Sequence, residues 1–245
     1  MQLRSFLYLL HFSFFVGEQP LHLSTACYRN QFGEPFSVEQ CKYYISAIRV
    51  TDASGATQTL LEGAHLVDAA DTTTLAVQVS TSLSQLTAIH FDIGVDSQVN
   101  TRGVNTGDLD PMLGMFWTWN TGYIDARLEG ASDSAHAPAH RFTWDVGGYR
   151  PGANAIREIV LSLPAQTSTP TDRASGQPDS PGNPPGRAST PSSLATRTIE
   201  IRANLLRWFD GKHPIHLSQS PSCHQPGAFA MQLADNYSTM FSIAP

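Results

Sequence analysis

The chain has 245 residues, of which 41% are hydrophobic, 9% aromatic and only 15% charged. Globular chains usually carry about a quarter charged residues, so this composition excludes a coiled coil or a long charged helix. The net charge is −6 and the only lysines are Lys42 and Lys212, so no lysine-rich patch exists and we expect no nucleic-acid or anionic-membrane partner. No apolar run reaches the roughly 18–20 residues of a membrane-spanning helix, and we expect no membrane span.

The N-terminal stretch has two interpretations. Residues 6–16 have the length and apolarity of the centre of a secretory signal, but no small-residue cleavage site follows them. Apolar residues also alternate with polar ones from Leu10 to Val16, and the alternation resumes after Gly17 and Pro20. We therefore predict a strand over residues 10–24, with a signal remnant or a disordered start over residues 1–9.

The three cysteines, Cys27, Cys41 and Cys223, match no zinc-ligand spacing. In an oxidising compartment Cys27 and Cys41 are candidates for a disulfide, and Cys223 with its neighbour His224 is a pair suited to a soft metal. Buried or incidental thiols are the simpler interpretation of each cysteine, and the sequence leaves these alternatives open.

Short apolar or alternating segments follow one another along the chain and are separated by turn residues. They cover residues 37–50, 60–67, 74–79, 86–95, 115–128, 142–149, 156–163 and 198–206. Such a pattern is typical of an all-β sandwich or barrel, and we predict a β-sandwich of short antiparallel strands with long loops. One or two short helices are expected, over residues 228–236 and near residues 203–209.

The stretch at residues 164–195 differs in kind from the rest. Its first part, residues 164–191, holds seven of the sixteen prolines, with Ser, Thr, Gly and Asp and almost no apolar side chain. Ordering it would cost about 1–2 kcal/mol per residue in backbone entropy with little burial in return. We predict a disordered insertion within one domain that covers residues 10–245.

The densest aromatic segment surrounds Trp117 and Trp119. Two residues apart on a strand, they share one face. A buried aromatic ladder is one interpretation, and a functional site that includes one of the tryptophans is the other.

Several motifs, taken in chain order, resemble the MbnP-like copper-binding family, which is associated with methanobactin biosynthesis. The strongest are GDLDP at 107–111, MFWTWNTGYI at 115–124, LEG at 128–130 and VGGY at 146–149. Weaker matches are KYYIS at 42–46, HLVD at 65–68, IGVD at 93–96, WF at 208–209 and ADNYSTMF at 234–241.

The resemblance implies a secreted or periplasmic β-sandwich that serves copper acquisition or storage. It also implies one copper ion bound by histidines and by a tryptophan oxidised to kynurenine, with a dihaem cytochrome c peroxidase-like partner as the oxidant. Opening the indole ring exposes an aryl amine, a nitrogen ligand that tryptophan lacks because its ring nitrogen only donates. Imidazole is in turn a good ligand for copper.

The metal candidates are Trp117, Trp119, His65, His90, His136, His140 and Asp145. His136 and His140 flank Pro138, so a loop rather than a helix must present them. Asp145 departs from the family pattern, because many relatives carry a histidine at that place. A carboxylate is harder than imidazole and suits Cu(I) poorly, so Asp145 puts the copper affinity in doubt unless another histidine compensates.

Two other functions compete with copper binding. A β-sandwich for ligand binding or adhesion, with a degenerate metal site, would use the two tryptophans as a platform for a sugar ring. Catalysis is the weaker option. The aspartates between residues 92 and 110 do not have EF-hand spacing, and the chain has no nucleophile elbow, P-loop, zinc-protease or dinucleotide motif. We expect a protein that is not an enzyme.

Overall fold

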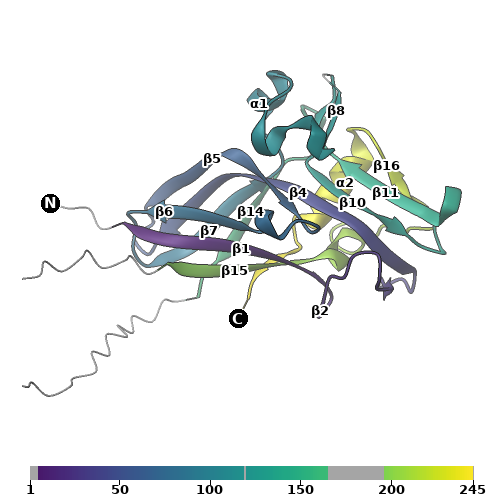
Figure 1. The fold of residues 1–245 in the computed structure, drawn as a ribbon, viewed down its shortest axis with the longest axis horizontal. Helices are drawn as coiled ribbons and strands as arrows, with labels where there is room; N and C mark the ends of the chain where they lie inside the picture. The colour runs from purple at the N-terminus through teal and green to yellow at the C-terminus, as the bar shows by residue number, and fades with distance from the viewer. Residues whose placement is uncertain (1–4, 119, 165–195, 245) are drawn as a thin grey trace, which may run out of the picture.

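The computed structural model of the protein describes residues 5–118, 120–164 and 196–244, and two β-sheets dominate it (Figure 1). The first sheet consists of β1 (Phe6–Val16), β2 (Gln19–Pro20), β6 (Ala76–Thr81), β15 (Arg197–Asn204) and β17 (Phe241–Ile243). The second consists of β3 (Tyr28–Arg29), β4 (Pro35–Asp52), β5 (Thr57–Asp68), β7 (Leu86–Ile93), β10 (Ala126–Ala131), β11 (Arg141–Val146), β14 (Arg157–Ser162) and β16 (Ser222–Cys223).

Small elements decorate these sheets. Two hairpins pair β8 (Phe116–Thr118) with β9 (Gly122–Tyr123) and β12 (Tyr149–Arg150) with β13 (Ala153–Asn154). The α-helices are α1 (Ser97–Thr101) and α2 (Ala228–Tyr237), and short 3-10 turns occur at η1 (Thr72–Thr74), η2 (Gly107–Leu109), η3 (Pro111–Leu113), η4 (Pro138–His140) and η5 (Leu205–Trp208). The all-β prediction with one or two short helices is confirmed.

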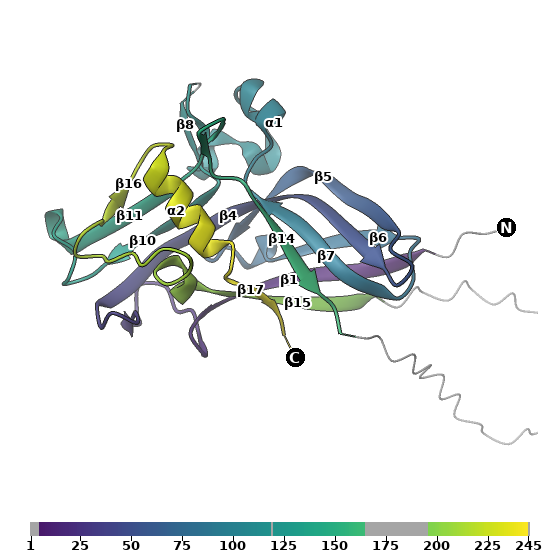
Figure 2. The same cartoon turned by 180° about the vertical axis from the view of Figure 1, so that it is seen from behind.

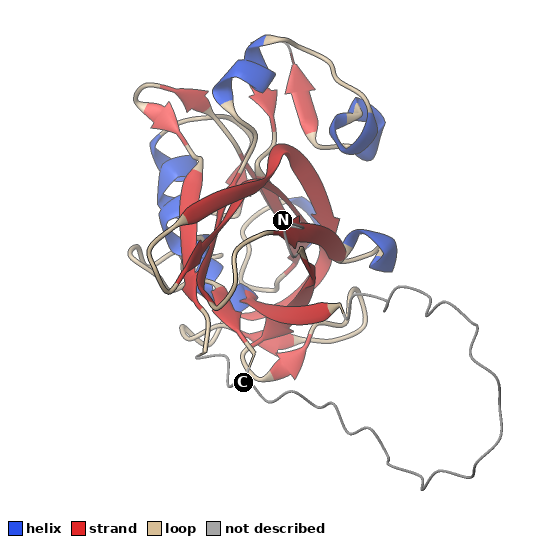
Figure 3. Cartoon of the chain, turned by 90° about the vertical axis from the view of Figure 1, so that its left-hand side faces the viewer, coloured by secondary structure: helices blue, strands red, loops and turns tan. Residues whose placement is uncertain are grey.

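The two sheets meet along both sides, because β5 contacts β6 and β14 contacts β17. Seen end-on, the strands curve around a common interior (Figure 3). Aromatic rings from both sheets fill it: Phe12 lies edge-on to Tyr43 and Phe91, and Phe91 lies edge-on to Phe241. Alternate residues of the strands supply this core, so side chains between them point outward.

Strand β1 begins earlier than the sequence indicates. The strand expected over residues 10–24 starts at Phe6 and ends at Val16, before a turn at Gly17 with φ of 64°. Residues 6–9, expected to belong to a signal remnant or a disordered start, pair with β6 on one side, and from Tyr8 onward they also pair with β15. The inward alternation of Leu10, Phe12, Phe14 and Val16 is as expected.

Two strand pairs are parallel, although only antiparallel strands were expected. β1 runs parallel to β15, and β11 runs parallel to the two-residue strand β16. Parallel partners need a long connection rather than a hairpin. Here the connections are most of the chain for β1 and the segment from β12 to η5 for β11. The second pair positions the site described below.

Strand β4 is not short: its 18 residues run from the β10–β11 end of the molecule to the β5–β7 end (Figures 1 and 2). Register shifts near Ala47, whose φ is 50°, mark an irregularity midway. β4 therefore belongs to both ends of the second sheet, the end formed with β10 and β11 and the end formed with β5 and β7.

All three cysteines lie within the described residues and are free thiols. Cys41 is buried in the core and Cys27 is exposed, so the Cys27–Cys41 disulfide considered above is not present. Most of the expected insertion, residues 165–195, lies outside the described residues.

Candidate metal centre

A row of charged side chains crosses the outer face of the second sheet. Strand register places Asp68 of β5 opposite Lys42 of β4, Lys42 opposite Arg127 of β10, and Arg127 opposite Asp145 of β11. β16 continues the row, because Cys223 pairs with Trp144 and His224 therefore follows beside Asp145. Tyr43, Ala126, Trp144 and Val146, the chain neighbours of these residues, are buried in the core, which leaves the charged side chains on the opposite face.

The charges in this row are paired along its length. Lys42 Nζ lies 2.9 Å from Asp68 Oδ2. Arg127 Nε donates to Asp145 Oδ1 at 2.6 Å and lies 3.1 Å from Glu129 Oε1. The second oxygen of Asp145, Oδ2, faces His224 Nδ1 at 3.6 Å. We name Arg127, Glu129, Asp145 and His224 the Asp145 corner.

The Asp145 corner is covered except at His224. The side chains of Arg127, Glu129 and Asp145 are 14%, 13% and 9% exposed, whereas that of His224 is 57% exposed. Leu113 and Gly114, which precede β8, lie over part of the corner and shield it from solvent. The Leu113 carbonyl accepts from Lys42 Nζ, and a Cβ at Gly114 would lie 3.6 Å from Arg127 Nη1. Solvent therefore reaches the corner chiefly along His224.

Trp117 lies beside this corner and not in the main core. It is half-buried on β8, and its six-membered ring packs against Gly147, two residues after Asp145. A Cβ at Gly147 would lie 3.0 Å from Trp117 Cζ3 and 2.5 Å from the Tyr123 carbonyl oxygen, so only glycine fits there. Trp119 lies outside the described residues. The strand expected over residues 115–128 is broken by the β8–β9 hairpin, in which Gly122, the first residue of β9, has φ of 78°.

Cys223 adjoins the corner but faces the interior. It is buried, and burial together with the nearby Asp145 carboxylate raises the pKa of its thiol to about 11. At neutral pH the sulfur keeps its proton, and metals bind the thiolate. His224 and not Cys223 is thus the member of that pair that the corner presents.

A buried acid stands at the start of β10. Asp125 Oδ1 accepts from the Val95 amide at 2.9 Å, while its Oδ2 has no hydrogen-bond partner. Burial raises the pKa of Asp125 well above its usual range, against the lowering effect of backbone donors and Arg157. Its carboxyl is therefore disposed to stay protonated.

His65 has both ring nitrogens engaged elsewhere. Nδ1 lies 2.7 Å from Asp108 Oδ2, and Nε2 lies 2.8 Å from the Thr74 carbonyl oxygen. Both partners lie outside the Asp145 corner, and in this arrangement neither nitrogen of His65 is free for a metal.

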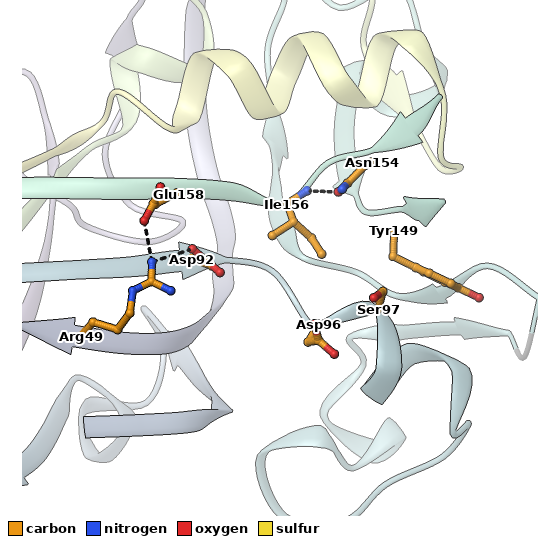
Figure 4. A pocket seen from close by; sticks show the side chains of 8 residues that line it. All are labelled: Arg49, Asp92, Asp96, Ser97, Tyr149, Asn154, Ile156 and Glu158. Atoms are coloured by element: carbon orange, nitrogen blue, oxygen red, sulfur yellow. Dashed lines mark hydrogen bonds and ion pairs between the residues drawn. The ribbon is translucent and has the colours of Figure 1, made fainter. Parts of the chain in front are cut away.

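His90 belongs to a second charged group, which we name the Arg49 cluster: Arg49, His90, Asp92 and Glu158. Arg49 Nη2 lies 2.5 Å from Glu158 Oε1 and 3.7 Å from Asp92 Oδ1. His90 Nε2 lies 3.0 Å from Thr51 Oγ1, and its Nδ1 lies 3.9 Å from Glu158. An open cavity of about 420 Å³ lies against Arg49, Asp92 and Glu158 (Figure 4).

His136 and His140 are exposed in the loop between β10 and β11. His140 Nδ1 lies 3.3 Å from the Ala135 carbonyl oxygen, and no hydrogen bond or ion pair of the His136 side chain is found. Ala139 and His140 both have φ above 50°, a left-handed geometry that non-glycine residues seldom adopt in succession. Trp144, the tryptophan that precedes Asp145, is fully buried, and its ring nitrogen donates to the Ser220 carbonyl.

The structure thus brings Trp117 and Asp145 to one place and leaves the candidate histidines elsewhere. Over residues 5–118, 120–164 and 196–244, no three His, Cys, Asp or Glu side chains form a group that could hold a metal ion. Sequence reasoning missed His224 as the partner of Asp145. The adjacent Cys223-His224 pair was the available signal, but its meaning depends on a parallel pairing between residues 79 positions apart.

The comparisons with known proteins agree with one another. The family model described as MbnP matches residues 8–225. The structure of MbnP from Methylosinus trichosporium is similar, with a TM-score of 0.59 and 12% sequence identity over 98% of this chain and 99% of that chain. No curated protein sequence matches this one. None of the helices in the described part of the chain is long and apolar enough to span a membrane.

Proposed function

This chain belongs to the MbnP family, and from that premise we propose that it binds one copper ion at the Asp145 corner, for acquisition or storage outside the cytoplasm. The observation that carries the proposal is the pair of donor atoms Asp145 Oδ2 and His224 Nδ1, 3.6 Å apart, with the Trp117 ring packed against Gly147 two residues after Asp145. Copper is cargo in this proposal, and the protein has no turnover of its own.

The donor chemistry of the corner fits copper in its oxidised form. Nitrogen and oxygen ligands of first-row metals lie about 2 Å from the ion, so donors at this separation can share one ion. The distance also exceeds an ordinary hydrogen bond, so the two groups do not saturate each other. Because a carboxylate with an imidazole suits Cu(II) better than Cu(I), we propose Cu(II) as the bound form. Because His224 is the exposed residue of the corner, we propose that the ion enters the site along its side chain.

Trp117 is the proposed source of a further ligand. Oxidative cleavage of the indole C2–C3 bond adds an oxygen atom to each carbon, and hydrolysis then releases formate and leaves an aryl amine. The proposed oxidant is peroxide, used by a dihaem cytochrome c peroxidase-like partner. The half-buried position of Trp117 supports this choice, since fully buried Trp144 has its ring nitrogen committed to Ser220.

The direct test is a Cu(II) competition titration against a chelator. We expect H224A and D145N to weaken binding at least tenfold. The matched controls H90A, in the Arg49 cluster, and H22A, an exposed histidine near β2, should bind as the unchanged protein does. Retention of full affinity by H224A would refute the site.

Mass spectrometry tests the tryptophan separately. Trypsin releases residues 103–127, which contain both Trp117 and Trp119, as one peptide. Co-expression with the haem partner should shift the mass of this peptide to the value expected when one tryptophan is converted to kynurenine. The W117F substitution should abolish this shift. An increase that persists in W117F would assign the modification to Trp119.

One observation favours a second function, binding of a small polar ligand. A cavity of about 260 Å³ lies beside the β8–β9 turn, between Asn120, Tyr149, Arg150 and Gln225. A sugar ring could lie against Tyr149 there. Glycan binding that is lost in Y149A, in a protein that takes up no copper, would favour this function over copper binding.

A further inference from the structure

Arg127 occupies the position at the Asp145 corner where a metal ion would find the most negative charge. Its Nε lies 2.6 Å from an oxygen of Asp145 and 3.1 Å from an oxygen of Glu129. Asp145 lies directly across the strand pair, and Glu129 lies two positions along the same strand, so both carboxylates are on the guanidinium's face of the sheet.

The positive charge of Arg127 cannot be removed by deprotonation. An arginine side chain stays charged at every accessible pH, and its planar fork suits carboxylates. Its movement is also restricted, because strand register fixes its base and its Nη1 lies close to Gly114, where an added Cβ would be 3.6 Å away. The corner therefore contains a permanent positive charge between two carboxylates under cover.

We infer that Arg127 is an internal competitor for copper, which sets the affinity of the Asp145 corner by holding Asp145 and Glu129 as its own counter-charges. This inference rests on the proposed function. A Cu(II) ion at His224 and Asp145 has to share Asp145 with the guanidinium and to tolerate a like charge nearby. Because the side chains are mostly covered, water screens that repulsion less than at an open surface.

Removal of the guanidinium leaves Glu129 and Asp145 without their shared counter-charge, with His224 beside Asp145. That set, oxygen and nitrogen donors with two negative charges, suits a divalent cation. The rest of the charged row is unaffected, since Lys42 remains paired with Asp68. Arg127 in the unchanged protein therefore limits the affinity for copper, so that the bound ion can be released again.

The test measures Cu(II) affinity by chelator competition in the full chain. We expect R127M to bind at least tenfold more tightly than the unchanged protein, and R127K, which keeps the charge, to stay within threefold of it. R49M, which removes the arginine of the Arg49 cluster, is the matched control and should change nothing. Equal or weaker binding by folded R127M would overturn the inference.

A second variant covers the case in which R127M does not fold because its carboxylates repel each other. R127M/E129Q removes one charge of each sign and should still bind more tightly than the unchanged protein. No gain in this folded double variant would also overturn the inference. Absence of copper binding by the unchanged protein together with a gain in R127M would refute the proposed function and support the competitor role.

Discussion

The Asp145 corner and the Arg49 cluster contain the same side chains in different settings. Each has one arginine, two carboxylates and one histidine on the outer face of the same sheet. In the Arg49 cluster the arginine is 29% and Glu158 is 57% exposed, and an open cavity adjoins them. In the Asp145 corner the arginine and both acids are at most 14% exposed, and Gly114 lies close to the guanidinium.

The difference shows that composition alone does not define a site. The Arg49 cluster is an ordinary surface ion-pair group, of a kind that contributes little to stability. The Asp145 corner holds its charges away from water, where each of them depends on its partner and where a bound ion would be held more strongly. Cover and the neighbouring indole are what distinguish the two.

The largest expected effect comes from disrupting the packing of Gly147 against Trp117 and Tyr123. In G147V the added side chain would meet the Tyr123 carbonyl and the Trp117 ring, and we expect the free energy of unfolding to fall by about 3 kcal/mol. G63V is the control, because nothing lies within 4 Å of a Cβ at that position of β5. Urea unfolding measures both. Equal stability of the two variants would mean that Trp117 does not pack against Gly147.

A smaller effect should separate the ion pairs of the two regions. We expect D145N to cost about 2 kcal/mol, because it leaves Arg127 covered with Glu129 as its remaining counter-charge. E158Q, at an exposed carboxylate, should cost less than about 1 kcal/mol. Added salt should reduce the effect of E158Q and leave that of D145N nearly unchanged. Equal costs for both variants would remove the distinction drawn here.

The effect that is smallest per pH unit concerns the pH dependence of stability. Burial raises the pKa of Asp125 and of Asp92, the latter with Arg49 acting against the shift. Above the unfolded pKa near 3.8, the unfolded chain loses a proton that the folded state retains, so stability falls as pH rises.

Fully buried Asp125 should contribute the steeper slope, up to about 1.4 kcal/mol per pH unit until its folded pKa is reached. D125N should therefore flatten the decline in stability between pH 4.5 and pH 8 more than D92N does. Chemical denaturation across this range measures the slopes. If D92N changed the slope more than D125N does, burial would raise the pKa of Asp92 more than that of Asp125, contrary to this prediction.

Local pattern predicted much of the fold. Period-two alternation predicted β7, with His90 and Asp92 on the side opposite Phe91, and the helix expected over 228–236 is α2. The all-β class followed from the spacing of such segments. Bounds were less accurate where tertiary pairing decides them, as at Phe6, which β6 and not local sequence holds in a strand.

The site was less predictable because it is assembled from distant segments. The resemblance pointed to Trp117 and Asp145, and both lie at the corner. His224 joins them only through the pairing of β16 with β11, which no local pattern encodes. Likewise the pairing of His65 with Asp108 depends on how η2 folds over β5. The roles of His65, His90, His136 and His140 in metal binding stay predictions.

The parallel pairing of β1 with β15 has a consequence for biogenesis. Tyr8 leaves the ribosome long before its partner Arg197, while β6 is available to the other side of β1 much earlier. One edge of the apolar strand β1 therefore stays unpaired until most of the polypeptide has been synthesised. Pairing between strands so far apart in sequence is slow and leaves the chain prone to aggregation. The nascent chain thus exposes this edge, a feature that holding chaperones bind, until its last fifth emerges.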